Sequence, residues 1–231
     1  MTFRLLLPLL LLGLGGCVAA TPPAASPPAA SSLLDRLPPE INGFTAFDPA
    51  LALAPPAGML LRPYQAADGP VIRVTLQPAA DPAERAALAT GAGAGPLRDR
   101  LDAEAAASFA FASALPQTIA ERGPDFLVGR RGAGPLLRCI DIRLTRPEGE
   151  QVALLRNLTC AGSLEGQVVR MQMITRHDAG ATAQAARVLA EFGGRAMESL
   201  LGLPPDPAAA PVAPHREETP PPRRADGLRR V

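Results

Sequence analysis

The chain has 231 residues, and its 23 basic residues, all of them arginine, against 22 acidic residues give a net charge of +1. A charge this balanced produces no long-range field that would attract nucleic acid or anionic lipid to the folded part. The chain also has no tryptophan and one tyrosine, so it lacks the usual stacking platforms for bases and sugars. We therefore expect no nucleic-acid partner.

The first seventeen residues have the pattern of an export signal. Arg4 precedes an apolar run from Leu5 to Leu14, and the segment ends in Leu14-Gly15-Gly16-Cys17. A run of about ten residues is too short to span a hydrocarbon core, which needs about twenty. The four-residue ending resembles the lipobox of bacterial lipoproteins, in which the signal is cut before the cysteine and the cysteine is acylated.

This resemblance implies that residues 1–16 are a signal peptide and that Cys17 carries the lipid, typically including palmitate. Val18, rather than an aspartate, follows the cysteine, which resembles the pattern that sends Gram-negative lipoproteins to the outer membrane instead of retaining them at the inner membrane. The expected location is therefore the periplasmic face of the outer membrane. The alternative is an ordinary secretory peptide cut near Val18-Ala19-Ala20, which would remove Cys17.

Two segments rich in proline and alanine flank one stretch of domain size. Residues 17–32 would form a tether, and residues 204–231 a Pro- and Arg-rich tail, because neither contains enough large apolar residues to offset chain entropy. Residues 33–203 remain as a single domain of ordinary size.

Within residues 33–203, the spacing of apolar residues and the turn signals predict strands, then helices, then strands, and then a last helix. Residues 59–65 and 71–77 are expected to pair through a turn at Asp68-Gly69. A short helix would begin at Asp81-Pro82, and a longer one at Pro96, with Arg100 and Glu104 paired four residues apart on its solvent side. The later strands are expected at 126–131, 136–146, 152–160 and 167–175, with Gly162-Ser163 in a turn.

The last helix is expected over 182–201, ending at Gly202 and Pro204. Leu189, Phe192 and Ala196 lie on its apolar face, with Glu198 among the polar residues opposite. These elements predict an α+β fold, an antiparallel sheet of about six strands covered by two main helices. Their order resembles the PsbP-like fold, which some exported bacterial lipoproteins use; no functional residues can be carried over from it.

Cys139 and Cys160 remain after lipidation, and an even pair in an exported chain favours a disulfide over two buried thiols. If Gly149-Glu150 is a two-residue hairpin loop, Cys139 lies opposite Cys160, with Cα atoms about 4.5 Å apart. The rival register takes Pro147 to Glu150 as the loop. It places Asp141 opposite Arg156 and leaves the cysteines diagonal.

Other site candidates carry weaker signals. Arg130 and Arg131, between two glycines, could contact an anion, although a solvated hairpin end explains them as well. His177-Asp178 are neighbours that would point to opposite faces of a strand. The run from Gly91 to Gly95 lacks the lysine of a phosphate-binding loop. We expect no metal, because two cysteines without a nearby histidine do not complete a zinc shell, and no cofactor.

The sequence therefore favours a non-enzymatic, membrane-anchored periplasmic lipoprotein. Its domain would bind an envelope protein or an apolar ligand in envelope assembly or maintenance. The alternative is an envelope hydrolase in which carboxylates such as Asp141 or Glu121 come together only in the fold.

Overall fold

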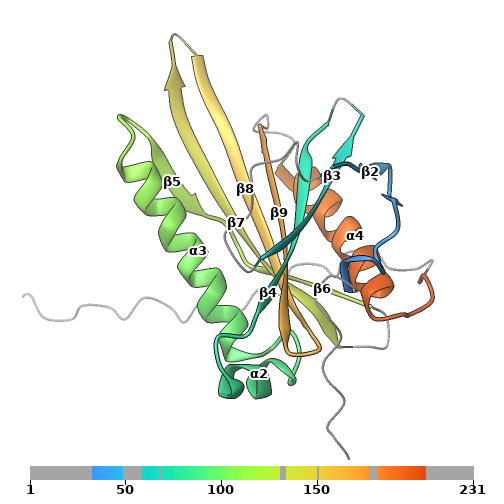
Figure 1. Cartoon of the computed structure of the whole chain (residues 1–231). Helices are drawn as coiled ribbons and strands as arrows, with labels where there is room; N and C mark the ends of the chain where they lie inside the picture. The colour runs from blue at the N-terminus through green and yellow to red at the C-terminus, as the bar shows by residue number, and fades with distance from the viewer. Residues whose placement is uncertain are drawn as a thin grey trace, which may run out of the picture.

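The computed structural model describes residues 33–48, 59–67, 69–130, 134–149, 151–176 and 182–206. The predicted signal peptide and tether, and nearly all of the predicted tail, lie outside this part. Within it the fold is α+β, with an antiparallel sheet of nine strands and three helices (Figure 1). The fold class agrees with the sequence prediction, whereas the strand count is higher than expected.

The strands of the sheet follow the order β1-β2-β3-β4-β9-β8-β7-β5, and β6 pairs with β7 beside β5. β7 and β8 are the longest, and β7 is long enough to pair with β6 along one part and β5 along another. Their bounds are β1 Glu40–Ile41, β2 Phe44–Ala46, β3 Leu60–Ala66, β4 Val71–Pro78, β5 Ile119–Arg122, β6 Phe126–Gly129, β7 Pro135–Glu148, β8 Gln151–Leu164 and β9 Gln167–Arg176.

Three short strands were not expected. β1 and β2 form a tight hairpin around Asn42 and Gly43, which have φ values of 49° and 80°. An Asn-Gly step is the usual signal of such a turn, so the sequence did contain it. β5 had no comparable signal, because Ile119 is its only large apolar residue and is exposed. β5 forms because its backbone hydrogen-bonds to β7, although its sequence lacks the alternation of apolar and polar residues typical of a strand.

The turn expected at Gly162-Ser163 is wrong. β8 continues to Leu164, and the reversal into β9 occurs at Glu165 and Gly166, which have φ values of 52° and 73°. Gly162 instead lies inside the strand, where an added Cβ would be 2.6 Å from the carbonyl oxygen of Leu136. Glycine here permits close approach of a neighbouring backbone rather than a reversal of the chain.

The helices begin where the sequence indicates. They are α2 Pro82–Leu88, α3 Gly95–Ser113 and α4 Thr182–Leu200. Asp81 caps α2, since its side chain accepts a hydrogen bond of 2.8 Å from the backbone N–H of Glu84. Gly202, with φ 66°, ends α4, and the Leu203 N–H donates back to the Glu198 carbonyl.

One residue of α4 departs from its expected face. Leu189, Phe192 and Ala196 are buried as expected, but Glu198, placed among the polar residues opposite, is only 2% exposed. It accepts from Arg195 and from the backbone N–H of Asp206, because the chain after α4 folds back over it.

Helices cover both faces of the sheet, which gives the domain two cores (Figure 1). On one face α4 packs against the strands around Phe192, which contacts Phe44 and Tyr64 edge to face. On the other face α2 and α3 pack through Leu88, Leu97 and Leu101. In β7, β8 and β9, residues that point to opposite faces therefore belong to different cores, as Cys139 and Ile140 do.

Candidate functional site

The cysteine pair lies where the shorter hairpin loop predicts. Glu148 pairs with Gln151, and Cys139 lies directly opposite Cys160. The two are joined as a disulfide, with Cα atoms 4.0 Å apart. Asp141 faces Leu158 and not Arg156, so the rival register is wrong.

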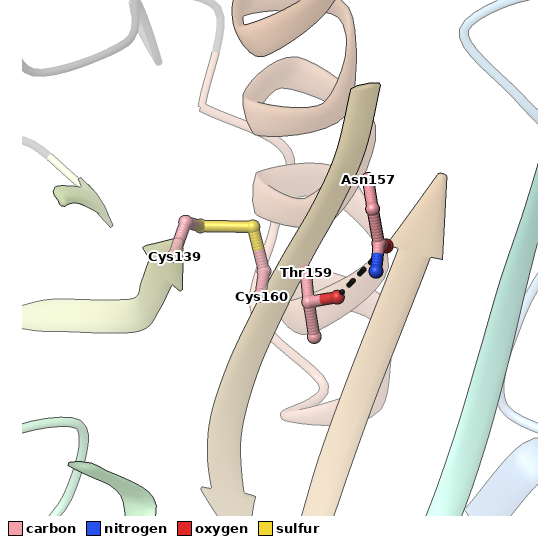
Figure 2. Close-up of a disulfide and its surroundings, with 4 residues drawn as sticks. All are labelled: Cys139, Asn157, Thr159 and Cys160. Atoms are coloured by element: carbon pink, nitrogen blue, oxygen red, sulfur yellow. Dashed lines mark hydrogen bonds between the residues drawn. A yellow bond between two sulfur atoms is a disulfide. The ribbon is translucent and has the colours of Figure 1, made fainter. Parts of the chain in front are cut away.

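The disulfide marks the α4 face of the sheet. Figure 2 shows it on one side of β8, with Asn157 and Thr159 on the other. Both cysteines are fully buried in the core under α4, so the bridge serves the packing of β7 and β8.

Of the two arginines suggested as an anion contact, Arg130 has an acidic neighbour within the protein. Its Nε lies 3.8 Å from an Oδ atom of Asp206, beyond the end of α4. Arg131 lies outside the described residues, as do His177, Asp178 and the lipidation candidate Cys17. No helix in the described part is long and apolar enough to cross a membrane.

The carboxylates considered for hydrolysis are differently placed. Asp141 is 2% exposed and accepts from Arg156 at both oxygens, at 3.0 and 2.6 Å, and from Arg143 at 3.2 Å. Glu121 is exposed on β5, paired in register with Arg143. Asp141 therefore belongs to a buried ion cluster in which guanidinium groups neutralise its charge. Its hydrogen-bond partners are arginines, whereas a hydrolytic pair would place a second carboxylate beside it.

A pocket of about 290 Å³ opens on the opposite face, between α3 and strands β4, β8 and β9. Its apolar wall includes Leu101, Ala107 and Val168, and its polar lining includes Arg100, Glu104 and Arg170. Ala103 and Ala107 are exposed on α3, so only short side chains stand at the helix side of the opening. An apolar cavity with a few charged groups is the usual form of a small-molecule site.

The charged groups of the pocket pair across elements. Arg100 donates to both oxygens of Glu84 on α2, at 2.8 and 3.1 Å, and Arg170 donates to Glu104 at 2.9 Å. The expected pair of Arg100 and Glu104 is therefore wrong, because each side chain reaches a closer partner on another element. The hydrogen bond from Arg100 lowers the pKa of the Glu84 carboxyl, which keeps this pair charged.

A polar strip continues from the pocket along the same face of the sheet. The Asn157 amide donates to Ser108 on α3 at 3.2 Å, and Gln172 donates to Asn157 at 2.9 Å. Arg73 on β4 lies opposite Gln172 in register. These contacts tie α3 to the sheet, and Asn157, Gln172 and Arg73 are all partly buried.

Two guanidinium groups of this strip are incompletely satisfied. The Nε atoms of Arg73 and Arg170 are buried, and neither has a hydrogen-bond partner. Sequence reasoning missed both residues. The available signal was the run Arg73-Val74-Thr75-Leu76-Gln77, in which a polar residue recurs at every second position of a strand.

The described residues hold no group of three or more His, Cys, Asp or Glu side chains placed to bind a metal ion. Comparison with protein-family models, with curated proteins and with solved structures gave no match to this chain.

Proposed function

We propose that this protein is a lipid-anchored binding protein of the bacterial envelope. Cys17 carries the lipid, the anchor lies in the outer membrane, and the domain stands in the periplasm. A disulfide between Cys139 and Cys160 is compatible with an oxidising compartment. The anchor itself is inferred from the lipobox resemblance.

The observation that carries the binding role is the pocket between α3 and the sheet. Its lining combines apolar side chains with Arg100, Arg170 and the single carboxylate Glu104. Hydrolysis by paired carboxylates would need two of them in one site, whereas here each of the two nearby carboxylates pairs with an arginine. The lining suits recognition of a small amphipathic molecule.

The anchor is tested by metabolic labelling with fatty acid and by membrane fractionation. A chain with Cys17→Ser should take up no label and should remain an unprocessed precursor. A matched chain with Cys139→Ser and Cys160→Ser loses two cysteines but keeps Cys17, and it should label normally. Unchanged labelling of Cys17→Ser would contradict the anchor.

The pocket is tested in cells by filling it. Ala106 and Ala107 are both exposed on the same turn of α3, but only Ala107 lines the pocket. In the source bacterium, Ala107→Phe should reproduce the envelope permeability of a deletion strain towards apolar dyes, while Ala106→Phe should behave as wild type. Wild-type permeability with Ala107→Phe would show that the pocket does not serve the envelope.

A further inference from the structure

The charges around the pocket do not balance. Three arginines lie on this side of the domain, Arg100 on α3, Arg170 on β9 and Arg73 on β4, and the first two pair with Glu84 and Glu104. No acidic partner of Arg73 is found among the described residues, and the side chain is half-buried. One positive charge of the polar strip, on the strand next to the pocket residue Arg170, is therefore uncompensated.

The two unpaired Nε donors belong to arginines on neighbouring strands. A buried donor without an acceptor costs about 1 to 3 kcal/mol, and more when it is charged. Arg73 faces Gln172, and Thr75 faces Arg170, so the two arginines are diagonal neighbours on one face of β4 and β9. Diagonal neighbours are about 7 to 8 Å apart at their Cα atoms, close enough for long side chains to share a ligand. Both Nε atoms lack an acceptor, and one anionic group could supply it.

The apolar part of the pocket lies next to these donors. Arg170 belongs both to the diagonal pair and to the pocket lining, where it adjoins Val168 and Leu101. The volume of about 290 Å³ is close to the lower limit of about 300 Å³ for ligand sites. A single short hydrocarbon chain suits this size better than a two-chain lipid.

We propose that the pocket binds a small single-chain amphiphile with one anionic head group. The head lies against Arg73 and Arg170, and the chain enters the apolar part beside α3. This inference rests on the proposed binding function and specifies its ligand class. Carboxylate and phosphate-monoester heads share the required chemistry, because guanidinium groups bind both through charge-assisted hydrogen bonds.

The test uses the full lipidated chain in nanodiscs of zwitterionic lipid, titrated by calorimetry with octanoate, octyl phosphate, octanol and acetate. Empty nanodiscs correct for partitioning of each probe into lipid. We expect octanoate or octyl phosphate to bind, and the stronger of the two identifies the head group. Octanol should bind at least about tenfold more weakly, as expected when charge-assisted hydrogen bonds are lost. Acetate should not bind measurably, because it has no chain.

Two matched pairs of variants locate the binding. Arg73→Gln should lower the affinity for the anionic probe about tenfold or more and leave the affinity for octanol unchanged. Arg98→Gln removes the same charge from an exposed position on α3 and should change neither. Ala107→Phe should abolish binding of every probe, and Ala106→Phe should not.

Equal affinity for octanol and octanoate, or equal effects of Arg73→Gln and Arg98→Gln, would overturn the proposed head-group site. Thermal melting of each variant shows whether it is folded, and Ala107→Phe gives a second reading should Arg73→Gln unfold. If no anionic amphiphile binds while Ala107→Phe still alters envelope permeability, the ligand class is wrong and the proposed function stands.

Discussion

Asp141 and Arg156 are each only 2% exposed, and Arg143 adds a second guanidinium to the same carboxylate. Removing one member of a buried ion pair costs about 3 to 5 kcal/mol, because the remaining charge has lost its partner. We therefore expect Asp141→Ala to lower the free energy of unfolding by about that amount. Urea denaturation measures the loss. Glu148→Ala, which removes a partly exposed carboxylate that pairs with Arg146 and Arg176, should have a much smaller effect.

The ionisation of Tyr64 can be measured directly, because Tyr64 is the only tyrosine of the chain. Burial raises the pKa of its hydroxyl, although nearby Arg62 opposes the shift, and the hydroxyl donates to the Pro38 carbonyl at 2.7 Å. A raised pKa means that the stabilisation is complete below the unfolded value of about 10 and is lost as the pH rises through the higher folded value.

We accordingly expect the tyrosinate absorbance of the native protein to appear at a pH above 10, together with the onset of unfolding. Tyr64→Phe should remove the absorbance change and reduce the alkaline loss of stability. Ionisation of native Tyr64 at its ordinary value, without unfolding, would contradict the burial argument.

Single residues were harder to predict than their elements because their partners come from distant parts of the chain. Glu198 has the spacing of a solvent-facing residue, and only the chain that returns at Asp206 makes it buried. Similarly, Arg73 and Arg170 could be placed on strands, but their unused donors depend on what the neighbouring strands offer. Periodicity identifies the side of an element and does not identify what covers that side.

The β7–β8 hairpin was predictable because its turn and its cysteines agree. Gly149 has a φ of 64°, which fits the first position of a two-residue loop, and that loop sets the register that joins Cys139 to Cys160. The bridge closes a loop with a sequence separation of 21, for which chain entropy gives about 3 kcal/mol.

A double variant with Cys139→Ala and Cys160→Ala should therefore keep the fold and melt several degrees lower, since about 3 kcal/mol is a large share of a typical 5 to 15 kcal/mol. Thiol labelling of the unreduced, denatured wild-type protein provides the direct check on the bond. Labelling of both positions there would refute the bridge.

The end of β8 was predicted wrongly, because the local sequence at Gly162 resembles a turn. Glycine followed by serine resembles a turn, but the close approach of Leu136 keeps this glycine inside β8. Gly162→Ala should destabilise the protein by about 1 to 3 kcal/mol through overpacking. Gly93→Ala is the control, since nothing lies within 4 Å of its added Cβ. Equal unfolding free energies for the two variants would contradict the proposed role of Gly162.

The arrangement of the domain as a whole followed from element order, because hairpins and two long amphipathic helices can bury their apolar sides only against one sheet. The described structure adds that each face has its own core. The likeness to the PsbP-like fold, the lipid anchor and the outer-membrane location stay predictions.

The C-terminal limit of the domain stays a prediction, and contacts of the chain beyond Leu203 bear on it. Leu203 was expected to end it, since the following residues are prolines and small residues. However, Asp206 is packed, with its carboxylate near Arg130 and its backbone N–H donating to Glu198 at 3.2 Å. Composition could not show this, because the contacts are polar and one of them uses only the backbone.

Two truncations that differ by three residues test this boundary. A chain ending at Asp206 should unfold at the same urea concentration as the full chain. A chain ending at Leu203 should lose about 1 to 2 kcal/mol, because Arg130 loses its carboxylate and buried Glu198 loses a donor. Limited proteolysis of the full chain should likewise stop after Asp206 rather than at Leu203. Equal stability of the two truncated chains would support the predicted boundary at Leu203.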